Sequence, residues 1–246
     1  MENCLTCSDA KILFACDLDN TLIHSHKRRR TGDICVEYYV DQEQSFMSPK
    51  ALDLLKKISE RVLFVPVTTR SINQYRRIFW TEDFLPRYAV VANGAYFLRN
   101  DKQENFLREV VSPYVEELET QQEKFSTDDR FNICRIVDES FLFLRCRDEI
   151  DADKLSFNTS LTVQHTGKKI YFFPPNLNKG AAINRLIKKF SPEKIFCAGD
   201  SEIDLPMLEL ADVAFAPKNL CGKNFVTCSD SPDFAEEFLQ HIFDKL

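Results

Sequence analysis

The stretch KILFACDLDNTLI, which runs from Lys11 to Ile23, decides the fold of this chain. Its apolar half, Ile12–Cys16, favours a β-strand and ends abruptly at two acids, Asp17 and Asp19. Because residues i and i+2 of an extended chain point the same way, the two carboxylates can converge on one group. Their position at the end of a buried strand is costly unless something neutralises them. The stretch therefore predicts a divalent cation beside a phosphate, with one acid as nucleophile and the other as acid and base.

Composition limits the class of protein. The chain has 246 residues, of which 44% are hydrophobic, so it can build one large α/β domain or a core with a smaller insert. Its net charge of −6 argues against a nucleic-acid partner. No run of about 18 apolar residues is present and the N-terminus lacks the build of a signal peptide, so we expect neither a membrane span nor export.

The nine cysteines sit mostly in strand-like runs, which is typical of buried free thiols in a reducing cytoplasm. We therefore expect a cytoplasmic protein. Cys4 and Cys7 form an isolated C-x-x-C pair. No second pair at zinc-finger spacing accompanies it, so a frayed N-terminal extension is favoured over a zinc site.

Short apolar runs alternate with amphipathic stretches in the first and last parts of the chain. The apolar runs are mostly unbroken by polar residues, which is typical of strands buried on both faces. This order predicts an α/β fold with a doubly wound, mainly parallel sheet. We expect strands at Ile12–Cys16, Val62–Val67, Tyr88–Ala92, Lys194–Ala198, Val213–Ala216 and Phe225–Cys228, and helices at Ala51–Glu60, Ile72–Phe79, Gly180–Phe190 and Asp233–Phe243.

The middle of the chain has the order helix, strand, strand, helix, strand, strand, which is typical of a compact α+β unit. We therefore predict an inserted smaller domain at about residues 108–168, within a core formed by residues 1–107 and 169–246. Its elements are expected at Pro113–Lys124, Phe131–Val137, Phe141–Arg147, Glu149–Leu155 (a short acidic helix), Leu161–His165 and Lys169–Phe173.

Further polar residues follow the predicted parallel strands, where ligands of open α/β sheets bind. Thr68, Thr69 and Arg70 come after the second strand, and Asp200 follows the strand at Lys194–Ala198, with Asp204 further on. Lys179 precedes the helix that leads into that strand. Carboxylates for a metal, a hydroxyl and amides for a phosphate, and an ammonium are the parts that phosphoryl transfer needs.

These residues resemble, in order and spacing, the four motifs of the haloacid dehalogenase superfamily of aspartate-nucleophile phosphatases. The motifs are Asp17-Leu18-Asp19-Asn20-Thr21, Thr68, Lys179, and Gly199-Asp200-Ser201 with Asp204. The insert resembles the C2-type α/β cap of the Cof-like and sucrose-phosphate-phosphatase-like branch, and Ala92-Asn93-Gly94-Ala95 resembles that branch's loop after the third strand.

The resemblance implies a role for each motif residue. Asp17 would be the nucleophile that forms an aspartyl phosphate, and Asp19 would protonate the leaving oxygen and then activate water. Asp17, the main-chain carbonyl of Asp19, and Asp200 would hold Mg²⁺, a hard ion that prefers oxygen ligands. Thr68 and Lys179 would hold the phosphoryl oxygens. Asp204 would support the metal's water or the Lys179 amine.

Four other residues are weaker candidates for contact with phosphate or substrate. Thr69 stands where the branch usually has Gly, so the loop around the phosphate is expected to be tighter. Arg70 is as well explained by a surface charge, and Asn93 with Gly94 by a turn. Ile203 replaces an Asn that often precedes the last Asp of the family's fourth motif, which removes a hydrogen bond behind the metal.

The run His26-Lys27-Arg28-Arg29-Arg30 is too short and too poor in aromatic residues for a nucleic-acid patch. We expect it in an exposed hairpin, where it could draw anionic substrate to the site. His24 is expected to be a structural or rim residue and His165 a strand residue of the insert.

The sequence thus indicates a two-domain Mg²⁺-dependent phosphomonoester hydrolase acting on a small phosphorylated metabolite, with sugar phosphates favoured by the branch resemblance. Two alternatives stay open. A phosphotransferase or phosphomutase would pass the phosphoryl group to another hydroxyl, and a non-catalytic regulator would only bind a phosphorylated ligand. The intact set of motif residues disfavours the regulator.

Overall fold

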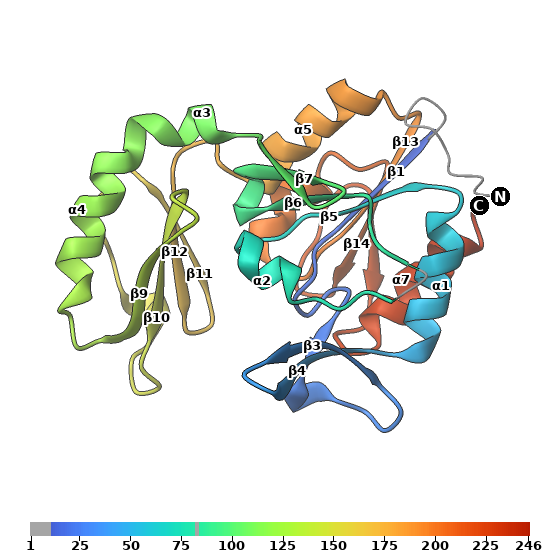
Figure 1. The fold of residues 1–246 in the computed structure, drawn as a ribbon, viewed down its shortest axis with the longest axis horizontal. Coiled ribbons are helices and arrows are strands. Elements are labelled where there is room, and N and C mark those ends of the chain that lie inside the picture. Colours follow the sequence, from blue (N-terminus) through green and yellow to red (C-terminus); the bar gives the residue numbers. More distant parts are fainter. Residues whose placement is uncertain (1–10, 82–83) are drawn as a thin grey trace.

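A five-stranded parallel sheet lies at the centre of the larger domain in the computed structural model, which describes residues 11–81 and 84–246 (Figure 1). The strand order is β15-β14-β13-β1-β5, so β1 is flanked by β13 and β5. Figure 1 shows helices α1 and α7 together on one side of this sheet and α5 on the other, which confirms the predicted α/β fold. The strands are β1 (Ile12–Cys16), β5 (Leu63–Pro66), β13 (Lys194–Ala198), β14 (Val213–Pro217) and β15 (Phe225–Cys228).

The helices of this domain begin at caps that the sequence supplies. The Ser48 side chain accepts a hydrogen bond from the backbone N–H of Ala51, and Ser71 forms a capping box with Gln74. Helix α2 ends earlier than expected because the next residues turn to bond the strand at Val36. The helical elements are α1 (Pro49–Ser59), α2 (Ile72–Arg76), α5 (Lys179–Phe190), η5 (Glu202–Asp204), α6 (Leu205–Leu208) and α7 (Phe234–Phe243).

The strand predicted at Tyr88–Ala92 is present but does not extend the parallel sheet. It is β6 (Tyr88–Val91), which pairs antiparallel with β7 (Tyr96–Arg99). The turn η2 (Ala92–Gly94) reverses the chain, with Asn93 at φ 57° and Gly94 at φ 111°. A single bridge, Val67 to Val90, joins β6 to the end of β5, and β7 pairs in turn with β8 (Lys102–Asn105).

A small three-stranded sheet follows the first motif. Its strands are β2 (His24–Ser25), β3 (Ile34–Tyr39) and β4 (Gln42–Met47), in the order β2-β4-β3, and η1 (His26–Arg28) precedes β3. Figure 1 shows the β3–β4 hairpin projecting from the core domain. The basic run lies before this hairpin, in η1 and the loop between β2 and β3. It does not form a hairpin as predicted, because β2 pairs with β4 and not with β3.

The insert folds as an antiparallel sheet, β11-β12-β10-β9, with helix α4 packed on one face (Figure 1). Phe125 of α4 packs on Phe131, Phe157 and Phe172. We call this unit the cap. It contains α3 (Arg108–Val111), η3 (Ser112–Tyr114), α4 (Val115–Ser126), β9 (Phe131–Val137), β10 (Phe141–Cys146), η4 (Ala152–Lys154), β11 (Thr162–Thr166) and β12 (Lys169–Phe173).

Two expectations about this unit differ from the structure. The short acidic helix at Glu149–Leu155 is only the three-residue turn η4, because the Lys168 ammonium binds the carbonyls of Asp148 and Ile150 that a helix would use. The predicted boundary at residue 168 also divides the β11–β12 hairpin. Since β12 lies between β11 and β10, the sheet of the insert extends to Phe173.

Within the described part of the chain, no helix has both the length and the apolar character that crossing a membrane requires. Cys4 and Cys7 lie outside the described residues.

Candidate active site

The central sheet brings three motif residues together because their strands are neighbours. Asp17 follows β1, Thr68 lies just beyond β5, and Asp200 lies just beyond β13. Backbone hydrogen bonds continue the pairing past the strand ends, from Asp17 N–H to the Ala198 carbonyl at 2.9 Å and from Val67 N–H to the Cys16 carbonyl at 2.8 Å. The carboxyl ends of parallel strands thus form one site, as predicted.

Lys179 joins the site from the first turn of α5. Its ammonium, on a residue only 1% exposed, donates to Asp17 Oδ1 at 2.5 Å and to Asp204 Oδ1 at 2.6 Å. Helix α5 can come this close to α6 because residue 180 is Gly: a Cβ there would lie 2.3 Å from the Pro206 carbonyl oxygen. The two carboxylates raise the pKa of Lys179 against the lowering effect of burial, so the group stays charged.

Asp204 organises the loop that carries Asp200. Its Oδ2 accepts hydrogen bonds from the backbone N–H groups of Asp200 and Ser201 and from the Ser201 hydroxyl. Its Oδ1 accepts from Lys179. Both oxygens are therefore engaged by the protein, which suits a residue that positions its neighbours. Gly199 is required here, because a Cβ would lie 2.5 Å from the Asp204 Cβ.

Negative charge exceeds positive charge in this cluster. Carboxylate oxygens of Asp17, Asp200 and Asp204 lie within 4.8 Å of one another, and the only ammonium bonded to them among the described residues is that of Lys179. Burial, together with the neighbouring acids, raises the pKa of Asp17 to about 8 and that of Asp200 to about 7. With all three groups ionised beside one ammonium, the cluster would carry two net negative charges, which one divalent cation would balance and so lower these pKa values again.

The donor set around Asp17 suits a hard cation. The Thr21 hydroxyl lies between Asp17 Oδ2 at 3.2 Å and Asp200 Oδ1 at 3.3 Å, so these two oxygens face the same space. The main-chain carbonyl of Asp19 accepts none of the backbone hydrogen bonds that close this turn. Carboxylate and carbonyl oxygens of this kind fit Mg²⁺.

Asp19 belongs to a separate cluster on the other side of the site. Arg70 grips it with two hydrogen bonds, Nε to Oδ2 at 2.8 Å and Nη2 to Oδ1 at 2.7 Å. The same guanidinium donates to Glu37 Oε2 at 2.9 Å, and Arg77 donates to Glu37 Oε1. Burial alone would raise the pKa of Asp19, but Arg70 outweighs it and holds this pKa at about 2. Asp19 is therefore a carboxylate in this state.

Replacing Arg70 by methionine is expected to destabilise the protein by about 3 kcal/mol, because it leaves the buried Glu37 carboxylate with one fewer cation. Arg76→Met is the matched control, since Arg76 pairs with Asp101 at the surface and should contribute less than about 1 kcal/mol. Urea denaturation of both variants measures the difference. Equal stability of the two variants would show that the ion pair between Arg70 and Glu37 contributes no more to stability than an exposed one.

The remaining predicted contacts fall into two groups. Thr68 is fully buried, and its hydroxyl accepts the backbone N–H of Arg70, while Thr69 opens into a cleft. Asn93 and Gly94 lie behind the site: the Asn93 amide donates to the Leu177 carbonyl, and Gly94 packs against the α3 and α5 elements. The structure thus gives these last two residues contacts that join core segments.

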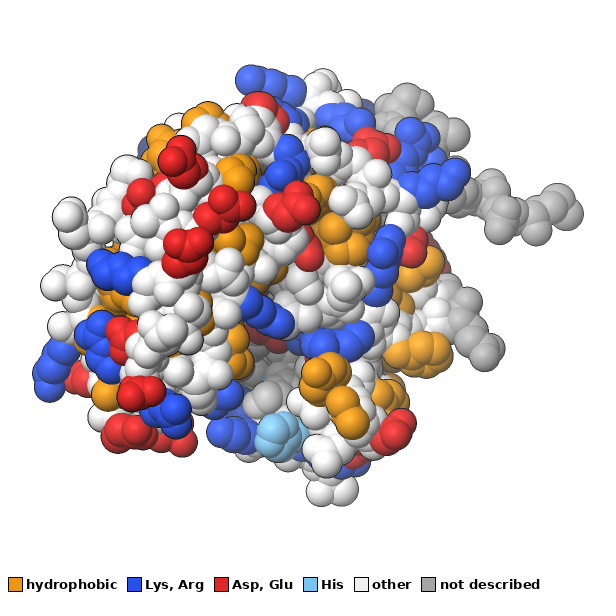
Figure 2. All heavy atoms as spheres, turned by 60° about the vertical axis from the view of Figure 1, so that its left-hand side comes forward, with side chains coloured by type: hydrophobic (Ala, Val, Ile, Leu, Met, Phe, Trp, Pro, Cys, Tyr) orange, Lys and Arg blue, Asp and Glu red, His pale blue; other side chains and the backbone are white. Residues whose placement is uncertain are grey.

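A cleft of about 380 Å³ lies between the core and the cap. Figure 2 shows a hollow in the surface with Lys and Arg side chains around it. Its core wall carries Asp19, Thr69, Arg70 and Gln74. Its cap wall carries Ile133, Arg135, Val137, Phe141, Phe143, Arg145, Thr166, Lys168, Lys169 and Tyr171. Asp19 therefore faces a space large enough for a small molecule.

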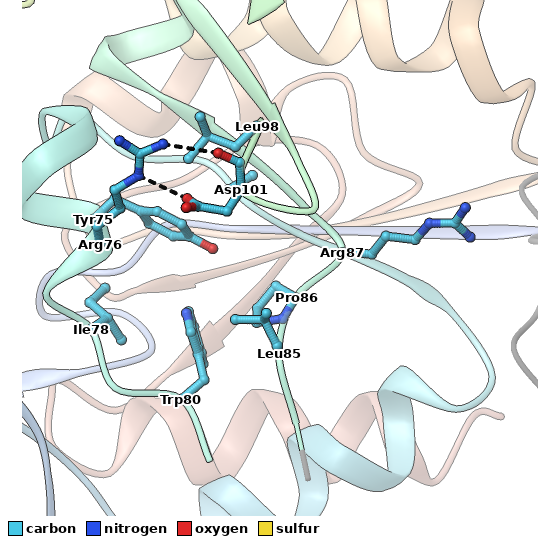
Figure 3. A pocket seen from close by; sticks show the side chains of 10 residues that line it. Tyr75, Arg76, Ile78, Trp80, Leu85, Pro86, Arg87, Leu98 and Asp101 are labelled. Atoms are coloured by element: carbon cyan, nitrogen blue, oxygen red, sulfur yellow. Dashed lines mark hydrogen bonds and ion pairs between the residues drawn. The ribbon is translucent and has the colours of Figure 1, made fainter. Parts of the chain in front are cut away.

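A second cavity of about 300 Å³ lies beside β6 and β7 (Figure 3). Figure 3 shows Trp80, Leu85 and Pro86 around it, with Arg76 bonded to Asp101 at its rim. None of its lining residues belongs to the motifs. The cleft under the cap, in contrast, is lined by Asp19 of the first motif.

The basic run does not form a free positive surface. Arg29 pairs with Glu43 at 2.5 Å, and Arg30 pairs with Asp233 and Glu236 near the start of α7. His24 is buried and bonded to Asp33, and His165 lies in β11, as expected. The sequence argument missed Glu37 and Arg77, because nothing in the chain order indicates that they meet Arg70.

Comparison with known proteins agrees with this geometry. A family model described as haloacid dehalogenase-like hydrolase matches residues 111–220, a range that includes Lys179, Asp200 and Asp204. No curated protein matches the sequence.

Solved structures share the fold along nearly the whole chain. The sucrose-phosphatase from Synechocystis, in complex with sucrose and phosphate, is 16% identical with a TM-score of 0.66, and the match covers 96% of this chain and 98% of that one. A trehalose-6-phosphate phosphatase related protein is 16% identical with a TM-score of 0.63, covering 95% and 97%. The trehalose-6-phosphate phosphatase from Aspergillus fumigatus is 16% identical with a TM-score of 0.54, covering 95% and 93%.

The family match and the shared fold confirm the resemblance that the four motifs indicated. This chain is thus similar to the haloacid dehalogenase-like hydrolases over residues 111–220 and shares its fold with solved phosphatase structures.

Proposed function

We propose that this chain is a Mg²⁺-dependent phosphomonoester hydrolase that works through an aspartyl phosphate. The observation that carries the proposal is the placement of Asp17. One of its oxygens bonds the Lys179 ammonium, the other faces Asp200, and Asp19 stands two residues on in the core–cap cleft. The first motif thus places a nucleophile beside an ammonium that can hold phosphoryl oxygens, and an acid and base two residues further on.

In the first step, an Asp17 oxygen attacks phosphorus and the bond to the leaving oxygen breaks, with a proton passing from Asp19 to that oxygen. Asp19 must take up this proton after substrate enters, because Arg70 keeps it ionised beforehand. A phosphate dianion placed beside Arg70 would compete for its charge and raise the pKa of Asp19. In the second step, the Asp19 carboxylate removes a proton from the water that attacks phosphorus, which frees Asp17 and phosphate.

Asp17, Asp200 and the Asp19 carbonyl would hold the metal ion. Bound Mg²⁺ supplies charge that offsets the carboxylates and polarises a phosphoryl oxygen. Lys179 holds Asp17 in place and shields its charge from the phosphate, while Thr68 lies beside them at the end of β5.

The substrate is proposed to be a small phosphorylated metabolite, with sugar phosphates favoured. Two similar structures are a sucrose-phosphatase and a trehalose-6-phosphate phosphatase by name, and the family resemblance points the same way. The cap would select the leaving group, since it supplies most of the cleft lining. The free buried thiols of Cys16 and Cys197 favour a cytoplasmic enzyme.

Purified protein is expected to release phosphate from a generic aryl phosphate in the presence of Mg²⁺, over many turnovers and without an acceptor. A generic ester needs no contact with the cap, so this measurement tests the core chemistry alone. Dependence of turnover on an added acceptor sugar would instead indicate a phosphotransferase or phosphomutase. Tight phosphate-ester binding without release would indicate a regulator.

A further inference from the structure

One face of the cap sheet points into the core–cap cleft, and its side chains follow from strand register. Alternate residues of β9, β10 and β12 share this face. Phe143 stands opposite both Arg135 and Tyr171, and Arg145 stands opposite Lys169. The opposite face carries Leu142, Leu144 and Phe172 and packs against α4. The cleft-facing rows therefore combine cations with aromatic rings.

The cations of this face form no close ion pair among the described residues, although Lys169 attracts the Asp19 carboxylate from beyond ion-pair distance. Arg135, Arg145 and Lys169 form no ion pair with a carboxylate within residues 11–81 and 84–246, and Lys168 binds two backbone carbonyls. Arg135 lies 5.7 Å from the ring centre of Phe143 instead. In a chain of net charge −6, four such cations on the wall of one cleft are an uneven distribution. Cations gathered without counter-charges in a cleft attract anions.

Resting on the proposed function, we infer that the leaving group of the substrate carries a second anionic group, a carboxylate or a second phosphate, which binds Arg135, Arg145 and Lys169. The first phosphate occupies the site at Asp17. The carbon skeleton between the two anions lies against Phe143 and Tyr171, whose ring centres are 5.3 Å apart. We call this cation group the second-anion subsite.

The chemistry of the lining favours an anion over a neutral sugar. A sugar hydroxyl can accept a hydrogen bond from Arg or Lys, but it leaves their positive charges unbalanced. Asp19 is the one carboxylate in the cleft lining, and both of its oxygens already accept from Arg70. Carboxylate and phosphate oxygens accept several hydrogen bonds and match these donors in charge.

Binding to full-length Asp17→Asn protein, loaded with Mg²⁺ and measured by calorimetry, tests the subsite without turnover. The first pair of probes is 3-phosphoglycerate and glycerol 3-phosphate, which differ by a carboxylate in place of a hydroxymethyl group. The second pair is glucose 1,6-bisphosphate and glucose 6-phosphate. If the subsite exists, the doubly anionic member of at least one pair binds about tenfold more tightly than its partner. A preference in the first pair indicates a carboxylate, and a preference in the second pair indicates a second phosphate.

Arg145→Gln in the same background is expected to bring the ratio within the preferred pair close to one, whatever it does to binding of the shared phosphate. Lys124→Gln is the matched control: it removes one charge from the exposed side of α4 and should keep the full ratio. Raising the salt concentration should lower the ratio for the parent protein, because exposed charges are screened.

Equal affinities within both pairs would overturn the inference, as would a preference that Arg145→Gln leaves intact. Turnover of aryl phosphate by the wild-type protein reports separately on the proposed function. Turnover with no preference for the second anion would leave a phosphatase without this subsite. A clear preference for the doubly anionic probe without turnover would support the second-anion subsite and contradict the proposed hydrolase activity.

Discussion

The Asp17→Asn protein is expected to fold and to hydrolyse aryl phosphate at least roughly a thousandfold more slowly than wild type. The amide matches the carboxylate in shape but is a poor nucleophile. It also removes one charge from a cluster in which three carboxylates share one ammonium. Lys179 keeps its bond to Asp204, so the metal-free variant should be at least as stable as wild type.

Steady-state phosphate release and thermal denaturation measure the two parts of this prediction. Asp53→Asn is the matched control, because Asp53 lies on the exposed side of α1, where it pairs with Lys57. It should change neither rate nor stability appreciably. Wild-type turnover by carefully purified Asp17→Asn protein would remove Asp17 from the role of nucleophile.

Removal of Mg²⁺ is expected to abolish turnover, and Ca²⁺ is expected not to restore it. Calcium accepts more ligands at longer distances, so it can take both oxygens of Asp17 and block the attack. Full activity in chelator would contradict the metal requirement. Good activity with Ca²⁺ would contradict the claim that the larger ion blocks attack by binding both oxygens of Asp17.

Metal binding should also be visible without any reaction. Because the cluster lacks two positive charges, Mg²⁺ should bind the folded protein and raise its Tm, with stabilisation of about 2.7 kcal/mol at a hundred times Kd. Asp200→Asn should shrink this shift strongly, since Asp200 faces Asp17 across Thr21. Asp53→Asn should leave it unchanged. An identical shift in the Asp200→Asn protein would place the ion elsewhere.

The sequence predicted the parts of the site that topology alone brings together. Asp17, Thr68 and Asp200 all follow strands of one parallel sheet, so their convergence follows from strand order. The bounds of β9 and β12 were also predicted correctly. Local patterns of this kind do not depend on distant contacts.

The sequence could not predict what depends on packing between distant segments. Glu37 meets Arg70 because β3 bonds the segment after α2, at Ile78 and Phe79, and no local pattern encodes that approach. The strand at Tyr88–Val91 pairs antiparallel with β7 because the turn after it, in which Ala92, Asn93 and Gly94 have positive φ, reverses the chain. The helix predicted at Glu149–Leu155 does not form because the Lys168 ammonium binds the backbone carbonyls of Asp148 and Ile150.

The turn between β9 and β10 of the cap contacts the first residue of α2 in the core. Asp138 of the cap accepts the backbone N–H of Ile72, the first residue of α2, at 2.7 Å. Tyr96 of the core donates to the Asp138 carbonyl. Any swing of the cap away from the core at this turn must break the hydrogen bond at the start of α2, two residues after Arg70. The cap is therefore hydrogen-bonded to the segment that directly follows Arg70, so the guanidinium that holds Asp19 lies two residues from the contact that a cap movement would break first.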